Sequence, residues 1–247
     1  MTAFSFYQNV TLLNAETHRK LRFKPFADVR FASKAQTALL AATEIPDCAV
    51  EYPVVFAPTK DGPVAVALLG LRQNENLFVT AEGKWDGRYI PAFLRRYPFL
   101  PATAPDGKVM IAIDDTCDNL GVDDGELLID ADGKATPYLN EMIKFIEQVH
   151  VDYARSAAFA KSLAERGLLR DMNAEVKLQA GTQFTLTGFQ IADEAKIAAL
   201  PDAELATMVR NGQLALLHAH LLSLRNLQKL AGRMRGTPPQ PTAETQH

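Results

Sequence analysis

Aromatic and arginine side chains gather in one short stretch of this chain, residues 85–99 (WDGRYIPAFLRRYPF), which holds five aromatic residues and three arginines. Aromatic rings stack on planar ligands or peptide side chains, and a guanidinium group binds a carboxylate through two parallel hydrogen bonds. A ligand-binding surface here would use Trp85, Arg88, Tyr89, Arg95, Arg96 and Tyr97. From sequence alone we favour the structural alternative, in which the rings pack a short helix onto a sheet and the arginines extend to solvent.

A reaction centre would need an acid or a base beside these arginines. An enzyme acting on a peptide or a small carboxylate-bearing molecule would hold the substrate carboxylate with Arg95 or Arg96 and use Asp114 or Asp115 as the base. This alternative predicts one enclosed pocket that contains an arginine and an acid. The sequence assigns no catalytic residue and leaves open whether the protein is an enzyme.

Motifs for phosphate-binding loops, serine hydrolases, zinc sites and dinucleotide binding are absent from the sequence. Asp130 to Glu141 matches a calcium loop at positions 1, 3 and 12, but Ala135 stands where the loop needs glycine, which favours a turn leading into a helix. His218 and His220 lie two residues apart on a predicted helix, so they diverge by about 200°. We therefore predict no metal and no cofactor.

Charge is unevenly distributed, although the net charge is only −3. Residues 114–132 include eight acids and no lysine or arginine. This pattern is typical of solvated turns, and the alternatives are a cation site or a docking surface for a basic partner. Between residues 205 and 243 five basic residues stand without an acid; they are Arg210, Arg225, Lys229, Arg233 and Arg235. They form either a solvated helix face or a contact surface for a membrane or partner.

Composition narrows the class of protein. With 47% hydrophobic and 22% charged residues, the 247-residue chain is neither disordered nor a membrane bundle. Its longest apolar run, residues 64–71, is far shorter than the roughly 20 residues that span a bilayer. The near-neutral charge argues against nucleic-acid binding, and two cysteines, Cys48 and Cys117, suit a reducing compartment. We expect a cytoplasmic protein without a transmembrane segment.

Hydrophobic patterns predict the elements that would position these residues. A helix over 137–166 is the clearest, with Thr136 as N-cap, Pro137 in the first turn and Gly167 after the end. A short helix is expected over 89–97, and two C-terminal helices over 202–210 and 213–234. Strands are predicted at 51–57, 64–71 and 76–80, which would pair as an antiparallel meander, and at 109–113, 126–129, 176–178 and 184–191.

Strands early in the chain and helices late favour an α+β fold over regular βαβ winding. We expect a mainly antiparallel sheet, one long central helix and a C-terminal helical pair. Residues 1–235 would form a single domain, and residues 236–247 (GTPPQPTAETQH) a disordered tail, because they carry no apolar anchor.

The order of motifs along the chain resembles the SapC family of bacterial proteins. The matching segments are 51–56 (EYPVVF), 67–71 (ALLGL), 76–79 (NLFV), Trp85, 89–92 (YIPA), 95–99 (RRYPF), 113–114 (ID), 125–128 (GELL), 219–224 (AHLLSL) and 226–227 (NL). The chain departs from the family pattern at Leu127 and Leu128, where the family often has Leu-Phe.

The resemblance implies a protein linked to surface-layer or peptide-related systems, and it carries over no catalytic residue. We interpret the chain as a non-catalytic, cytoplasmic accessory protein that binds a peptide or protein partner. The alternatives are the enzyme described above and, from the family name alone, a structural component of a surface layer. The sequence does not define the oligomeric state.

Overall fold

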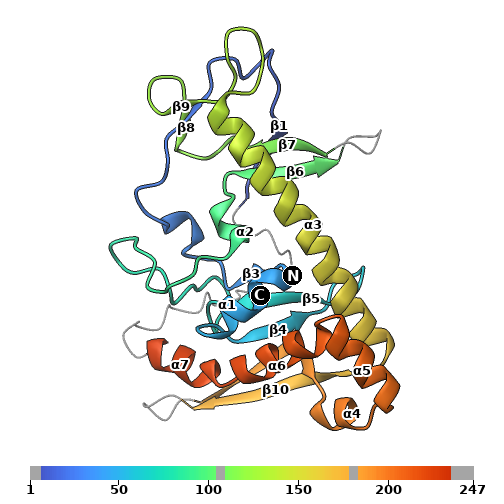
Figure 1. The fold of residues 1–247 in the computed structure, drawn as a ribbon. Helices are drawn as coiled ribbons and strands as arrows, with labels where there is room; N and C mark the ends of the chain where they lie inside the picture. The colour runs from blue at the N-terminus through green and yellow to red at the C-terminus, as the bar shows by residue number, and fades with distance from the viewer. Residues whose placement is uncertain (1–6, 104–108, 178–182, 235–247) are drawn as a thin grey trace, which may run out of the picture.

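The computed structural model describes residues 7–103, 109–177 and 183–234. Within these ranges the chain forms seven α-helices and three antiparallel sheets, so the predicted α+β class is confirmed. Figure 1 shows the long helix α3 (Pro137–Glu165) running from the two small sheets to the region of α4 (Glu194–Ala198) and α5 (Asp202–Arg210). The predicted disordered tail, 236–247, lies outside the described residues.

The largest sheet has five strands in the order β10-β11-β4-β5-β3. These strands are β3 (Thr37–Leu39), β4 (Val54–Ala57), β5 (Val64–Leu68), β10 (Leu169–Lys177) and β11 (Gln183–Ala192). The predicted pairing of the first two meander strands is confirmed, with Val54 opposite Ala67 and Ala57 opposite Val64. Val55, Phe56, Ala65 and Leu68 are all fully buried, which explains the continuous apolar runs in these strands.

The predicted third strand of that meander, 76–80, is wrong. The edge of β5 is occupied instead by β3, which comes earlier in the chain, with Ala38 opposite Ala67. After β5 the backbone turns at Gly70, where a Cβ atom would lie 2.0 Å from the carbonyl oxygen of Glu75. Residues 76–80 then make a single bridge, between Val79 and Trp85.

Two three-stranded sheets lie at the other end of α3 (Figure 1). One has the order β1-β7-β6, and its strands are β1 (Val10–Leu12), β6 (Phe99–Thr103) and β7 (Val109–Asp114). The other has the order β8-β2-β9, with β2 (Arg22–Phe23), β8 (Leu120–Gly121) and β9 (Glu126–Leu127). A small apolar core under these sheets includes Phe23, Phe99 and Leu128.

Helix α3 joins this small core to the large one. Its Leu139 and Ile146 belong to the small core, whereas Phe159, Ala160 and Leu163 belong to the large core around the five-stranded sheet. The predicted caps are confirmed: the Thr136 hydroxyl oxygen accepts from the Leu139 amide at 3.4 Å, and Gly167 has a φ of +65°. The helix therefore fixes the two cores relative to each other.

The C-terminal helices α6 (Gln213–Ser223) and α7 (Asn226–Arg233) lie along the five-stranded sheet (Figure 1). The prediction of one helix over 213–234 is wrong, because it is interrupted between these two. The reason is tertiary: the buried Asn226 amide donates to the carbonyl oxygens of Ala49 (2.8 Å) and Tyr52 (3.2 Å). These bonds tie the start of α7 to the end of α1 (Ile45–Ala49).

His220 on α6 is a core histidine. It is fully buried, and its ring bridges two strands: Nε2 lies 3.0 Å from the Ala192 amide and Nδ1 lies 2.8 Å from the Val54 carbonyl oxygen. Since an amide nitrogen only donates, Nε2 must accept, and Nδ1 must carry the proton that it donates to Val54. Burial lowers the pKa of His220 to about 4, against the opposing effect of the Val54 bond.

Across the described ranges, no helix is both long enough and apolar enough to cross a membrane. Cys48 and Cys117 are both buried and free. Burial raises the pKa of each thiol, so neither is a thiolate at neutral pH.

Candidate functional site

A tight turn at residues 80–84 directly precedes the segment 85–97. Residues 80 and 84 pair through the Thr80 amide and the Lys84 carbonyl oxygen (2.9 Å), and Gly83 at φ +80° makes the turn possible. After the turn, Trp85 contacts Tyr52, and its indole Nε1 donates to the Tyr52 hydroxyl at 3.2 Å. Tyr52 in turn donates a short hydrogen bond to the Tyr89 carbonyl oxygen.

Beyond Tyr89 the chain forms the predicted short helix, although α2 (Ala92–Arg95) is shorter than the expected 89–97. Its first turn is held by Glu44, a buried carboxylate in the 3-10 helix η2 (Ala42–Glu44). Glu44 Oε1 accepts from the Ala92 amide (2.7 Å) and the Tyr89 hydroxyl (2.8 Å), and Oε2 accepts from the Ala41 amide (3.0 Å). One interior carboxylate thus holds the segment at Tyr89 and Ala92.

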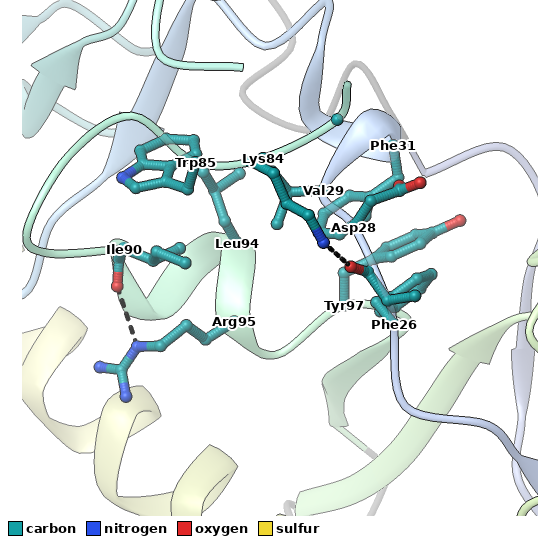
Figure 2. Close-up of a pocket in the computed structure, with 12 residues that line it drawn as sticks. Phe26, Asp28, Val29, Phe31, Lys84, Trp85, Ile90, Leu94, Arg95 and Tyr97 are labelled. Atoms are coloured by element: carbon teal, nitrogen blue, oxygen red, sulfur yellow. Dashed lines mark hydrogen bonds between the residues drawn. The ribbon is translucent and has the colours of Figure 1, made fainter. Parts of the chain in front are cut away.

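A surface pocket of about 300 Å³ lies between this segment and residues 26–31. We call it the aromatic pocket; it is lined by Phe26, Ala27, Asp28, Val29, Phe31, Gly83, Lys84, Trp85, Ile90, Leu94, Arg95 and Tyr97. Figure 2 shows Trp85, Phe31, Phe26 and Tyr97 around it, with the Lys84 side chain reaching from the Trp85 side to the opposite wall and Arg95 at one edge. The rings of Phe31 and Tyr97 stack with centroids 4.6 Å apart, so one wall is a continuous aromatic face.

Two hydrogen bonds join the opposite walls of the aromatic pocket. The Val29 amide donates to the Gly83 carbonyl oxygen at 2.8 Å, and Lys84 Nζ donates to the Ala27 carbonyl oxygen at 2.8 Å (Figure 2). Both bonds connect segments more than fifty residues apart in the sequence. One backbone bond and one side-chain bond thus hold the two walls of the pocket together in the protein without a ligand.

Arg95 stands at the margin of the aromatic pocket in a fixed orientation. Its Nε donates to the Ile90 carbonyl oxygen at 2.9 Å, and its Nη2 donates to the Tyr89 hydroxyl at 3.2 Å. Its guanidinium carbon lies 5.1 Å from the ring centroid of Phe145 on α3. Arg95 is exposed, and Nη1 has no hydrogen-bond partner in the described part of the chain, so that donor is available to a carboxylate.

Arg96, the next residue, has the opposite environment. It is only 3% exposed, and its guanidinium carbon lies over the rings of Phe93 (4.9 Å to the centroid) and Tyr153 (5.6 Å). Its Nε has no hydrogen-bond partner among the described residues. Arg96 lines neither cavity described in this section, so its guanidinium belongs to the interior between the segment and α3.

Arg88 lies on the other side of Trp85, beside a second cavity of about 270 Å³. We call this the basic cavity; its lining residues are Val50, Glu51, Phe78, Arg88, Lys229, Leu230 and Arg233. The two cavities share no lining residue. The structure thus places Trp85, Arg95 and Tyr97 together, assigns Arg88 to a separate cavity, and leaves Tyr89 as the support of Arg95.

The two acids considered as possible bases are both engaged in structural bonds. Asp114 is fully buried and accepts from the amides of Gln8 (2.9 Å) and Asn9 (3.1 Å) and from the Thr116 hydroxyl (2.7 Å). Burial alone would raise the pKa of Asp114, but these hydrogen bonds outweigh it and hold the pKa below the usual value. Asp115 accepts from the Asn9 side chain at 2.8 Å. Neither acid lines the aromatic pocket or the basic cavity.

No cluster of three or more histidine, cysteine, aspartate or glutamate side chains suited to a metal occurs among the described residues. The calcium-like loop is a turn, as favoured from sequence: Asp130 Oδ1 accepts from the amides of Asp132 and Lys134, both at 2.9 Å. Helix α3 begins directly after it.

Sequence reasoning missed Phe26, Phe31 and Lys84 in the aromatic pocket, and Glu44 beneath it. The first three lie in segments without a clear hydrophobic period, so nothing local indicated their partners. The position of Glu44, between the apolar run 38–42 (ALLAA) and Ile45, was the one available signal for a buried carboxylate.

Fold and cavities together define an α+β protein with two separate surface cavities on either side of one aromatic, arginine-containing segment. The family model described as SapC matches residues 13–230 of this chain. The chain therefore belongs to the SapC family. No curated protein and no solved structure matches it.

Proposed function

We propose that this SapC-family protein is a non-catalytic accessory protein that binds a peptide or a protein segment in the aromatic pocket. The observation that carries the proposal is the fixed guanidinium of Arg95 beside a preformed wall of aromatic rings. Such a site suits an aromatic or aliphatic side chain next to a carboxylate: the rings provide apolar contact, and Arg95 provides a charge-assisted hydrogen bond.

The volume of the aromatic pocket agrees with this class of ligand. About 300 Å³ is at the lower end of the range for ligand pockets and accommodates one large side chain with its neighbouring backbone. The bonds between Val29 and Gly83 and between Lys84 and Ala27 preorganise the walls, so little conformational entropy is lost on binding. A second cation, Lys84, also lines the pocket and favours an acidic ligand, while the one acid in the lining, Asp28, pairs with Arg30.

The enzyme alternative lacks a comparable observation. It requires a free base in the same cavity as an arginine. Asp28 lines the aromatic pocket with Arg95, but its carboxylate pairs with Arg30 and accepts from the Arg30 amide. The carboxylates of Asp114 and Asp115 are committed to bonds with Gln8, Asn9 and Thr116. We therefore place binding ahead of catalysis.

Peptide arrays of defined sequence test the proposal. Each peptide carries one aromatic residue next to one aspartate or glutamate, and the best peptide is then titrated in solution. We expect Arg95→Ala to weaken its affinity at least tenfold, because a charge-assisted bond is worth about 1.5–3 kcal/mol. Arg88→Ala is the matched control, since Arg88 is an exposed arginine of the same segment that does not line the pocket.

Equal effects of the two substitutions, or no peptide bound with a dissociation constant below about 1 mM, would overturn the proposal. Arg96→Ala is not a suitable variant, because Arg96 is interior and its loss would disturb the fold.

The proposal also places the protein in the cytoplasm and links it, through its family, to surface-layer or peptide-related systems. The two free, buried cysteines support a reducing compartment. Fractionation of the native host checks the location: recovery in the cell envelope would contradict it.

A further inference from the structure

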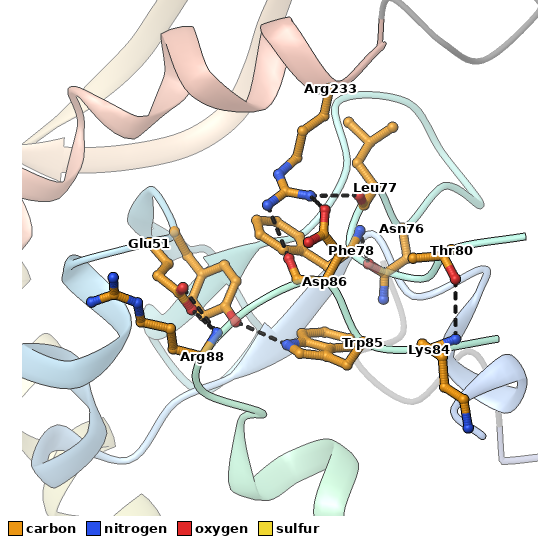
Figure 3. A network of polar contacts seen from close by, with 11 residues as sticks. Glu51, Asn76, Leu77, Phe78, Thr80, Lys84, Trp85, Asp86, Arg88 and Arg233 are labelled. Carbon is orange, nitrogen blue, oxygen red and sulfur yellow. Dashed lines mark hydrogen bonds and ion pairs between the residues drawn. The ribbon is translucent and has the colours of Figure 1, made fainter. Parts of the chain in front are cut away.

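The basic cavity is formed by three segments that are distant in the sequence. Val50 and Glu51 follow α1, Phe78 and Arg88 flank the turn at 80–84, and Lys229, Leu230 and Arg233 belong to α7. Figure 3 shows the polar contacts along one side of it, with Arg233 reaching Asp86 and with the guanidinium of Arg88 extending away from Glu51. Any ligand bound there would contact both the segment 85–97 and the C-terminal helix.

One of the three cations of the cavity is neutralised. Arg233 pairs with Asp86 through a short Nη1 contact, and its Nη2 donates to the Asp86 carbonyl oxygen at 2.9 Å. Its guanidinium carbon also lies 4.2 Å from the ring centroid of Phe78. Arg233 is therefore held as part of the wall.

The one carboxylate of the cavity is also engaged. Glu51 accepts from the backbone amide of Arg88 at 2.9 Å (Oε1) and 2.7 Å (Oε2), and from that of Tyr89 at 3.2 Å. Gly87 makes this approach possible, because a Cβ atom there would lie 2.9 Å from the Tyr52 hydroxyl and 3.2 Å from Glu51 Oε2. Glu51 thus fixes the backbone that carries Arg88.

Two cationic side chains have no direct partner, and even with the Glu51 carboxylate in the lining the cavity keeps a positive excess. Neither the Arg88 guanidinium nor the Lys229 ammonium forms a hydrogen bond or an ion pair with any residue in the described ranges. Both side chains are exposed at the cavity, whereas Phe78 and Leu230 behind them are 2% and 1% exposed. The cavity consequently combines unpaired cations at its rim with a small apolar area, in which Val50, 60% exposed, is the most accessible side chain.

We propose that the basic cavity binds a small organic anion. Its acidic group contacts Arg88 and Lys229, and its apolar part lies against Val50. A volume of about 270 Å³ fits a molecule of roughly one aromatic ring with its acidic group. This site is separate from the aromatic pocket and goes beyond the proposed peptide binding.

Calorimetric titration with benzoate tests the site, with benzyl alcohol as an uncharged molecule of similar shape and inorganic phosphate as an anion without an apolar part. We expect benzoate to bind more tightly than either, and its affinity to fall when salt is raised from about 0.05 to 0.5 M, because exposed charges are screened. Arg88→Gln and Lys229→Gln should each weaken benzoate binding about two- to fivefold, as expected for partly exposed charge contacts.

Arg225→Gln is the matched control, because Arg225 is exposed next to α7 and does not line the cavity. The titrations are carried out in the Arg95→Gln background, so that benzoate bound in the aromatic pocket does not contribute. The proposal is overturned if benzoate does not bind, if phosphate or benzyl alcohol binds as tightly, or if Arg225→Gln weakens benzoate as much as Arg88→Gln does.

Discussion

The interior side and the exposed side of segment 85–97 use the same residue types for different purposes. Arg95 is exposed and fixed at a pocket margin, whereas Arg96 is 3% exposed and packed against the rings of Phe93 and Tyr153. Interior polar groups such as Glu44 accept several hydrogen bonds that join distant segments. Composition therefore marks the segment, while burial decides which of its side chains are accessible.

The largest effect on stability is expected at Glu44, which holds the interior side of the segment. Glu44→Gln replaces one carboxylate oxygen by an amide that cannot accept from a backbone N–H, so a buried donor loses its partner. We expect a loss of about 3 kcal/mol in the free energy of unfolding, measured by denaturant titration. Asp47→Asn, an exposed acid on the adjoining α1, should stay within about 0.5 kcal/mol. Equal losses of unfolding free energy in the two variants would show that the buried Glu44 contributes no more than an exposed acid.

The second-largest effect on stability is expected at His220, and it depends on pH. Its folded pKa of about 4 lies below the ordinary 6.5. Between pH 4 and pH 6.5 the histidine is therefore protonated in the unfolded chain and neutral in the folded chain. The stability contribution is complete above pH 6.5 and is lost as pH falls toward 4, by about 2–3 kcal/mol. Equilibrium unfolding at several pH values should show this loss in the wild type and not in His220→Gln. His218→Gln, an exposed control, should still lose stability as pH falls. A His218→Gln variant without this loss would show that His220 is not its source.

Asp114 gives a smaller effect at lower pH. Its folded pKa is below the ordinary 3.8, so it stabilises the fold above that value and the contribution disappears as pH falls below it. Asp114→Asn should cost about 2 kcal/mol at pH 7, because the amide nitrogen faces a backbone donor. The gap between wild type and variant should narrow in unfolding titrations below pH 4. A constant gap would show that hydrogen-bond geometry, not charge, sets the contribution.

The smallest effect on stability is expected at Arg95, on the exposed side of segment 85–97. Arg95→Ala should change the free energy of unfolding by less than about 0.5–1 kcal/mol, because its bonds to Ile90 and Tyr89 lie at the surface. Denaturant titration beside Arg88→Ala provides the measurement. A loss as large as that of Glu44→Gln would mean that Arg95 belongs to the structural side of the segment.

Local sequence signals predicted the elements that local interactions determine. Helix α3 carries its caps, Thr136 and Gly167, within its own sequence, so its limits were correct to one residue. The strand expected at 76–80 failed because β3, from an earlier segment, occupies the edge of β5. The break before Asn226 depends on bonds to Ala49 and Tyr52, more than 170 residues away.

The candidate site follows the same rule. The concentration of rings and arginines indicated the segment 85–97, which borders both cavities. It did not indicate Phe26 and Phe31, because these meet Tyr97 only in the fold. Nor did it separate Arg95 from Arg96, because α2 is only four residues long and has no period that could show its buried face.

Trp85 is the only tryptophan in the chain and lines the aromatic pocket, so its fluorescence tests the central claim most directly. The best aromatic, acidic peptide from the array is titrated against the wild type and Arg95→Ala, with calorimetry in parallel. The account predicts that Trp85 emission changes with the same dissociation constant that calorimetry gives, and that Arg95→Ala shifts both at least tenfold. Peptide binding seen by calorimetry without any change at Trp85 would contradict it.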